Sequence, residues 1–320
     1  MPYNEKTRVQ VPALMHLAKL GYDFIPINSK ENKPNLDTAT NILMDSFTQA
    51  FKRLNPTKNA KEALTEMKKR LDYGDLGKSF YEYLLKSEHQ IIDFDNPNHN
   101  LYEMTAELPY KSFRPDITLF INGLPLVNIE VKQPLAQQGI KEEKDRHIKR
   151  YTNSENKVFY NLAQIWLFSD NLPYDENNPD QGAFYSASYS PIFQRFIEAD
   201  KLDITPPPPE NDQNDLNHQN HQSLEEIQKR ILKEFNLKDT AYLKSPKDTP
   251  TNSLLTSFCS QKRLCFILKY GISFLREKNS EFKKHIWRYA QMFASLNVLK
   301  ELQKHYKSII KAMKITQKIP

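Results

Sequence analysis

Apolar residues in the first part of the chain, up to about residue 90, recur at the spacing of helices. A first stripe tolerates a proline in its opening turn and consists of Val11, Leu14, Met15 and Leu17. A second stripe, for which we expect Asp37 to be the cap, consists of Leu36, Leu43, Phe47, Phe51 and Leu54. Residues 60–71 and 77–86 predict two further short helices.

From about residue 90 the pattern changes to short runs of β-branched and aromatic residues, which predict strands. These runs are QIIDF (90–94), LYEMTAEL (101–108), DITLFI (116–121), LVNIEVK (126–132), QIWLFS (164–169) and GAFYSAS (182–188). The charged segment 141–162 predicts helices that cover the sheet. The predicted fold class is therefore α/β, with a mixed sheet flanked by helices that ends at about residue 200.

The rest of the chain divides into a polar tract and a helical part. Residues 205–222, TPPPPENDQNDLNHQNHQ, lack the apolar side chains that an ordered segment needs, so they predict a linker or an exposed loop. Residues 223–236 and 252–313 show patterns that are almost entirely helical. We therefore expect three regions, 1–204, 205–222 and 223–320.

The net charge of +6 is unevenly distributed. Residues 1–200 carry 24 basic and 27 acidic side chains, whereas residues 201–320 carry 21 basic and 12 acidic ones. A basic second part is compatible with a polyanionic partner. A lysine-rich helical surface that is simply solvated explains the same numbers.

Glycine, cysteine and the apolar runs exclude several classes of protein. The chain has seven glycines, and none are spaced as GxxxxGK[ST] or GxGxxG, so it lacks the loops that hold nucleotide phosphates. Its two cysteines are too few for a disulfide framework or a thiolate zinc site. Since no apolar run is long enough to span a membrane and MPYNEKTRVQ is not a secretory signal, we expect a cytoplasmic protein without a membrane partner.

The dipeptide Asn122-Gly123 supplies the positive φ angles of a tight turn, so the runs on either side predict an antiparallel hairpin. In the second of these strands Asn128, Glu130 and Lys132 share one face, because side chains alternate along a strand. The alternation of apolar and polar residues, taken alone, is explained by a half-buried strand whose polar face lies in water and has no catalytic role.

Asp116 changes that interpretation. It follows Pro115 at one end of the hairpin, where it can approach Glu130 and Lys132. Two neighbouring carboxylates repel each other unless a cation lies between them, and carboxylate and water oxygens are the ligands of Mg²⁺. The lysine would orient or deprotonate an attacking water, or stabilise charge that develops on a phosphate. Asp116, Glu130 and Lys132 therefore predict a site for phosphodiester hydrolysis.

These residues also carry a resemblance to a known family. PD (115–116) followed by EVK (130–132) resembles the PD-(D/E)xK nuclease core. FRPDITLFINGLPLVNIEVKQP, with LPY before it, resembles the nuclease domain of the R (restriction) subunit of type I restriction enzymes, and RVQVPALMHLAKLGYDFI resembles the helical start of these subunits. KSFYEYLL, IDFDNPNHN and QIWLFSDNLPYDENNPDQGAFYSASYSP are similar to segments that follow in the same order. The resemblance covers most of residues 5–200.

The resemblance implies a role for each matching residue. Asp116 and Glu130 would bind Mg²⁺, and Lys132 would act on the nucleophile. Many such nucleases carry a further acid on their first helix, and Glu5 is the nearby candidate.

The helix after the core departs from the family pattern. Some R subunits carry a QxxxY element there that contributes to cleavage, but in this chain Tyr151 follows His147, so the element is absent or altered. Arg146 and Arg150 lie one helical turn apart and, together with Tyr151, are candidates for contacts to the DNA backbone. A solvated helix face explains the two arginines equally well.

Residues 249–275 and 285–302 resemble the entry to the first helicase-like domain of the same subunits. In that family the glutamine of an RYxQ-like element contacts the adenine of ATP, and RYAQ here ends at Gln291. The family pattern leads on to the phosphate-binding loop of a DNA-translocating motor, whereas this chain continues as KHYKSIIKAMKITQKIP. We therefore expect a truncated R subunit, or one whose motor is a separate polypeptide.

The resemblance implies an Mg²⁺-dependent endonuclease that acts on double-stranded DNA with specificity and modification subunits as partners. ATP belongs to the full-length family, and this chain lacks the phosphate-binding loop. Two alternatives remain at this point. One is a catalytically silent fragment that binds DNA or other subunits, and the other is a stand-alone, structure-specific DNA nuclease.

Overall fold

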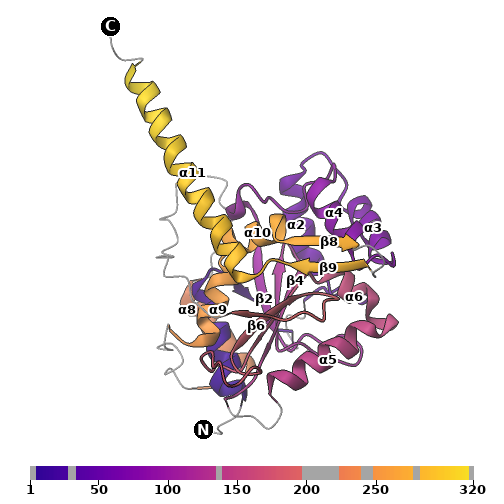
Figure 1. The fold of residues 1–320 in the computed structure, drawn as a ribbon. Coiled ribbons are helices and arrows are strands. Elements are labelled where there is room, and N and C mark those ends of the chain that lie inside the picture. The colour runs from indigo at the N-terminus through magenta and orange to yellow at the C-terminus, as the bar shows by residue number, and fades with distance from the viewer. Residues whose placement is uncertain are drawn as a thin grey trace.

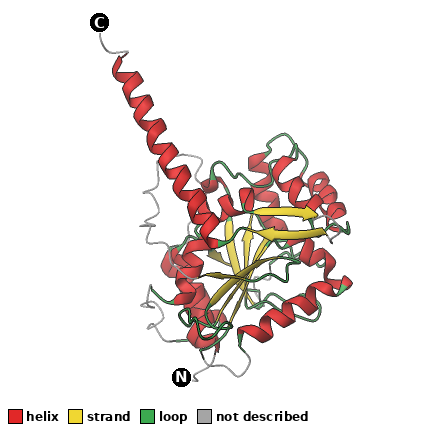
Figure 2. Cartoon of the chain, in the orientation of Figure 1, coloured by secondary structure: helices red, strands yellow, loops and turns green. Residues whose placement is uncertain are grey.

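The structure is a computed structural model in which a central sheet is flanked by helices (Figures 1 and 2). It describes residues 5–27, 34–134, 139–196, 223–238, 248–276 and 282–316, with the side chains of the last helix described to residue 306. The tract 205–222, for which the sequence predicts a linker, lies outside the described residues.

Seven strands of the described residues form one mixed sheet, and their order in space is their order in the chain. They are β1 (Asp23–Phe24), β2 (Tyr102–Ala106), β3 (Ile117–Ile121), β4 (Leu124–Val131), β5 (Ile165–Ser169), β6 (Ala183–Ala187) and β7 (Gln194–Phe196). The pairs β1–β2 and β4–β5 are parallel, and the other pairs are antiparallel. This arrangement confirms the predicted α/β class, although the short edge strands β1 and β7 were not predicted.

Helices cover both faces of the sheet. They are η1 (Lys6–Gln10), α1 (Val11–Lys19), α2 (Met44–Leu54), α3 (Ala60–Leu71), α4 (Lys78–Lys86), η2 (Pro97–His99), α5 (Ile140–Thr152), η3 (Ser154–Asn156), α6 (Lys157–Leu162), α8 (Leu224–Glu234), α9 (Pro250–Cys259), α10 (Gln261–Tyr270) and α11 (Tyr289–Thr316). On one face Ile129 of β4 belongs to the same core as Leu14 of α1 and Leu254 of α9. On the other face Trp166 of β5 packs with Tyr160 of α6.

The predicted hairpin is confirmed as β3–β4, with Asn122 and Gly123 at its turn. Both residues have positive φ angles, 51° and 77°, as a tight connection between twisted strands requires. A Cβ atom on Gly123 would lie 2.5 Å from the carbonyl oxygen of Leu43 and 2.8 Å from the backbone nitrogen of Phe47. The turn therefore needs glycine both for its conformation and for the close approach of α2.

Two predictions for the first hundred residues were wrong. The second helix begins at Met44, because Asp37 accepts bonds from Thr40 in a turn and Asn41 has a φ of 60°. Residues 90–94 form no strand, although Ile91 is buried. Side chains there form the hydrogen bonds to the backbone that a neighbouring strand would otherwise form. Asn122, for example, donates to the carbonyl of Ile91 at 2.8 Å.

The sequence predicted a second part of the chain that is almost entirely helical, and this prediction was wrong. A hairpin of β8 (Ile272–Arg276) and β9 (Phe282–Ile286) lies between α10 and α11, and β9 contacts β6 of the large sheet. Lys284 of β9 is buried, and its Nζ donates to Gln164 Oε1 and to Ser188 Oγ, both at 2.7 Å. Burial holds the pKa of this lysine well below its usual value. The β8–β9 hairpin is therefore anchored in the body of the protein.

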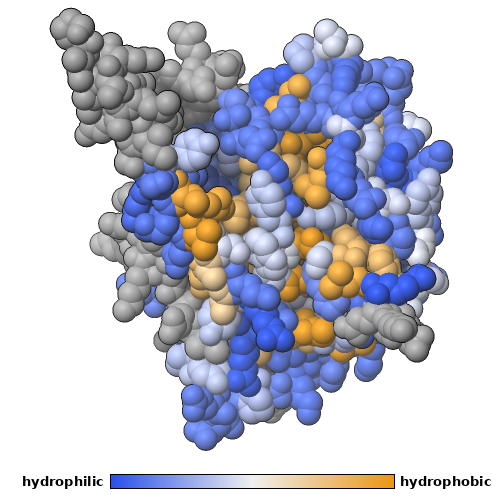
Figure 3. All heavy atoms as spheres, turned by 45° about the horizontal axis from the view of Figure 1, so that its top comes forward, coloured by the Kyte–Doolittle hydropathy of each residue, from blue (hydrophilic) through white to orange (hydrophobic). Residues whose placement is uncertain are grey.

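Helix α11 extends away from the sheet, in yellow in Figure 1. Among its described side chains Val298 and Leu302 are mostly exposed. Among the coloured atoms of Figure 3 the surface in view is largely hydrophilic, with apolar patches between the polar side chains. None of the helices in the described ranges combines the length and the apolar character that crossing a bilayer requires.

We expect Gly123→Ala to lower the free energy of unfolding by about 2–4 kcal/mol, since alanine disfavours a positive φ and the added methyl group collides with the backbone of α2. Chemical denaturation of the full chain measures this change. Gly74→Ala is the matched control, because a Cβ atom there meets nothing within 4 Å. Equal stability of the two variants would contradict this account of the turn.

Candidate active site

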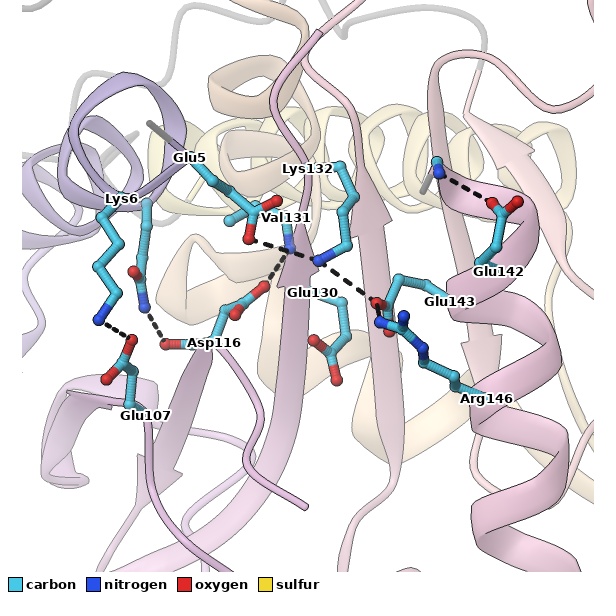
Figure 4. A network of polar contacts seen from close by, with 12 residues as sticks. Glu5, Lys6, Glu107, Asp116, Glu130, Val131, Lys132, Glu142, Glu143 and Arg146 are labelled. Atoms are coloured by element: carbon cyan, nitrogen blue, oxygen red, sulfur yellow. Dashed lines mark hydrogen bonds and ion pairs between the residues drawn. The ribbon is translucent and has the colours of Figure 1, made fainter. Parts of the chain in front are cut away.

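The candidate site lies at the end of the β3–β4 hairpin that is farthest from the turn, just beyond the last paired residues. The register joins Ile117 to Ile129, so one step further Asp116 stands opposite Glu130. Oδ2 of Asp116 accepts a hydrogen bond of 2.8 Å from the backbone N–H of Val131. The two carboxylates therefore share one face of the hairpin, as the sequence predicted, and Figure 4 shows them near each other.

The N-terminal helical segment closes one side of this opening. Gln10, at the end of η1, is buried and donates from Nε2 to the backbone carbonyl of Asp116 at 2.7 Å. Nothing in the sequence singled out Gln10. Its contact fixes the backbone from which the Asp116 carboxylate projects.

Both carboxylates of the hairpin hold their protons more tightly than usual. Burial raises the pKa of Asp116 to about 6, against the opposing effect of the Lys132 ammonium. Burial raises the pKa of Glu130 well above its usual value, and the nearby Asp116 carboxylate raises it further. Two acids in this condition favour a cation as their neighbour.

Lys132 lies between two further carboxylates, shown in Figure 4. Its Nζ is 3.4 Å from Oε1 of Glu5 and 3.3 Å from Oε1 of Glu143, and its side chain is 12% exposed. Burial lowers the pKa of Lys132, but the surrounding carboxylates, Asp116 foremost, outweigh it, so the pKa lies above the usual value. The lysine is therefore a fixed positive charge at neutral pH.

Helix α5 brings three charged residues to the same place, because Glu143, Arg146 and Arg150 repeat at helical spacing. Arg150 donates to Oε1 of Glu130 at 2.7 Å and lies 4.0 Å from Oε2 of Glu143. Arg146 is paired with Oε1 of Glu143, and its side chain is 40% exposed. The two arginines thus contact acids of the site, and their predicted contacts with DNA stay a prediction.

His147 lies on the same buried face of α5 as Glu143, and together with Tyr151 it belongs to an aromatic cluster. His147 is fully buried, with its ring centroid 4.8 Å from that of Trp166 and 5.5 Å from that of Tyr151. Burial lowers the pKa of His147 to about 3, so its ring is neutral. Tyr151 also packs against Tyr160 and Tyr189, and its contact with DNA likewise stays a prediction.

Gln291 is not among the residues that meet at the hairpin. It is exposed in the first turn of α11, where its Oε1 accepts a hydrogen bond of 2.9 Å from the backbone N–H of Arg288. This contact caps the start of α11.

The donor set of the site restricts which metal it fits. Within the described ranges, no group of three or more His, Cys, Asp or Glu side chains is arranged to hold a metal ion. Asp116 and Glu130 supply two carboxylates, which is what Mg²⁺ commonly takes from a protein while water completes its octahedron. The residues therefore fit a largely hydrated Mg²⁺ and do not fit a structural zinc ion.

Glu143 is the charged residue at this site that the sequence did not single out. A signal was present, because Glu143 precedes Arg146 by three positions and Arg150 by seven, so it had to share their face of the helix. The rotation of α5 relative to the sheet decides whether that face meets Lys132. No local pattern encodes this rotation.

Two related proteins have named functions. A Methanocaldococcus jannaschii protein that carries the name of a type I restriction enzyme endonuclease subunit, MjaIXP, is 27% identical over 206 residues, which are 55% of this chain and 19% of that protein. The type I restriction enzyme HindI endonuclease subunit of Haemophilus influenzae is 25% identical over 182 residues, 48% of this chain and 17% of that protein. The matched regions thus span less than a fifth of these curated relatives.

A family model covers more than half of the chain. The model described as type I restriction enzyme R protein N terminus matches residues 2–175, which include β1 to β5 and every charged residue of the candidate site. The resemblance to the N-terminal part of R subunits is thereby confirmed, and the chain belongs to the family of type I restriction enzyme R protein N termini.

Proposed function

We propose that this chain is an Mg²⁺-dependent DNA endonuclease with a PD-(D/E)xK site, which serves as the nuclease part of a type I restriction enzyme. The observation that carries the proposal is the pairing of Asp116 with Glu130 on one face of the β3–β4 hairpin, with Lys132 beside them. Family membership and the names of the relatives support the same activity.

Each residue of the site has a definite task in this proposal. Asp116 and Glu130 would hold Mg²⁺, which when bound supplies Lewis acidity toward a phosphate oxygen and lowers the pKa of bound water. Lys132, held as an ammonium, stabilises negative charge that grows on the phosphate and orients the attacking water. Since its pKa is raised, it is a poor proton acceptor, so the role of general base is not assigned to it.

The arginines of α5 extend the positive field around the acids. Arg150 neutralises Glu130 and stacks over the ring of Phe113 at 5.1 Å. Arg146 is more exposed than Arg150 and projects from the same helix face, where a DNA phosphate would be attracted to it. The substrate proposed for this surface is double-stranded DNA, and specificity and modification subunits are the proposed partners.

One observation favours a different function. Glu130 already has Arg150 as a cationic partner, and Glu143 is already in contact with Lys132 and Arg146. A site whose acids already have cationic partners within the chain is compatible with a catalytically silent subunit that only binds DNA or partner proteins. Cleavage by the purified chain separates the two functions.

The first prediction of this proposal concerns Asp116 and Glu130. The full chain nicks supercoiled plasmid with Mg²⁺ or Mn²⁺, and Asp116→Asn or Glu130→Gln lowers the rate by at least about a hundredfold, because each removes a charge that holds the metal. Asp145→Asn, an exposed neighbour on α5, is the matched control and leaves the rate unchanged. Nicking that is absent, or equal in wild type and Glu130→Gln, supports the silent subunit.

The second prediction separates Lys132 from the metal ligands. Lys132→Gln lowers the maximal nicking rate by about 10–1000-fold and leaves the Mg²⁺ concentration at half-maximal rate unchanged, because the lysine stabilises charge without binding the metal. Lys141→Gln, an exposed lysine of α5, is the control. A large rise in the Mg²⁺ requirement of Lys132→Gln would assign the lysine to metal binding instead.

The third prediction needs no cleavage. Mg²⁺ at about one hundred times its dissociation constant stabilises the full chain by about 2.7 kcal/mol, because the metal binds the folded state. In thermal unfolding the wild type gains stability with Mg²⁺, and Asp116→Asn gains much less. Equal gains would place the bound Mg²⁺ away from Asp116.

A further inference from the structure

Glu143 is a buried carboxylate in contact with cations from two elements. Its side chain is 2% exposed, and Oε1 lies 3.3 Å from Nζ of Lys132 and also accepts from Arg146. Oε2 lies 4.0 Å from Arg150 and has no hydrogen-bond partner among the described residues. A carboxylate is therefore held in the interior with only part of its hydrogen-bonding capacity used.

This arrangement is unfavourable for stability alone. Removing a carboxylate from water is costly, and buried ion pairs are often replaced by apolar residues without loss of stability. An oxygen with no hydrogen bond adds to the cost. Since Glu143 is buried at a cost in stability and lies next to Lys132, we expect it to have a role in the function of the site.

We propose that Glu143 is a positioning residue for phosphodiester hydrolysis, which holds the Lys132 ammonium in place beside Asp116 and Glu130. The inference rests on the proposed nuclease function, because the task of Lys132 belongs to that function. Glu143 acts through Lys132 and does not itself hold the metal or touch the phosphate.

Glu143 is better suited to this task than Glu5, which also contacts Lys132. The Glu5 side chain is 33% exposed and stands at the N-cap of η1, where it makes no capping hydrogen bond. Glu143 lies within the 13-residue helix α5 and is fixed by its ion pair with Arg146. Lys132 is thus held between an exposed partner and a buried one, and the buried partner sets its position.

Chemical labelling of Lys132 tests the inference without any need for cleavage. The full chain is treated with an amine-acylating reagent, and the acylation rate of each lysine is followed by mass spectrometry. In Glu143→Gln we expect Lys132 to react about tenfold faster than in wild type, because a charge-assisted contact at its ammonium is lost. Lys144, which is paired with Asp180 at 3.3 Å, is the internal reference and keeps its rate.

Asp145→Asn on the same helix is the matched control and leaves the rate at Lys132 unchanged. An unchanged rate at Lys132 in Glu143→Gln overturns the inference. If that variant also exposes Lys144 by unfolding, Glu143→Asp decides instead. Its carboxylate is shorter by one methylene, so it draws back from Lys132 while it keeps the charge that Arg146 requires, and faster acylation of Lys132 alone is the expected result.

Nicking assays add a functional measurement. Glu143→Gln lowers the maximal nicking rate by about tenfold and leaves the half-saturating Mg²⁺ and DNA concentrations unchanged, as displacement of Lys132 predicts. Nicking at the wild-type rate by this variant overturns the inference. Absence of nicking by the wild type overturns the proposed function instead, and acylation of Lys132 then decides whether Glu143 holds it.

Discussion

The register of the β3–β4 hairpin is the constraint on which the site depends. The turn at Asn122 and Gly123 fixes which residues of the two strands face each other, and this register sets Asp116 opposite Glu130. A slip by one residue would move Glu130 and Lys132 to the opposite face, because side chains alternate along a strand. Contacts of α2 with the turn and of Gln10 with Asp116 hold the hairpin from both ends.

Burial then determines the electrostatics of the site. Desolvation raises the pKa of both hairpin acids, so their ionised forms need positive partners. Arg150 of α5 contacts Glu130 itself, whereas Lys132, which directly follows β4, and Arg146 of α5 contact the neighbouring acid Glu143. The sheet and helix α5, which covers one of its faces, therefore also supply the positive charges that balance the acids of the site. This balance leaves the two hairpin acids suited to share one divalent cation.

The sequence was sufficient for the parts of the fold and site that depend on local patterns. Period-two alternation and the Asn-Gly turn predicted the hairpin and the shared face of Glu130 and Lys132. Predictions were wrong where a polar side chain replaced a regular element, as when Asp37 formed a turn instead of a helix cap. The β8–β9 hairpin was missed because Lys284 occupies a buried position of β9 and breaks the apolar pattern.

The residues that escaped prediction at the site share one cause. Glu143 and Gln10 reach it from helices that are distant in the chain, and their contacts depend on how those helices pack against the sheet. Packing of this kind is set by the whole core, in which α1, α9 and the sheet share one cluster of buried side chains. The local sequence predicts which residues share a face of each helix, but not whether that face is turned toward the hairpin.

In the proposed site Asp116 and Glu130 together hold a divalent cation. The most direct measurement is an anomalous difference map from crystals of the full chain grown with Mn²⁺, which stands in for Mg²⁺ and scatters anomalously. We expect a peak bonded to carboxylate oxygens of both Asp116 and Glu130, with Lys132 beside it. Well-ordered density for both carboxylates with no peak between them, at saturating Mn²⁺, would contradict the account.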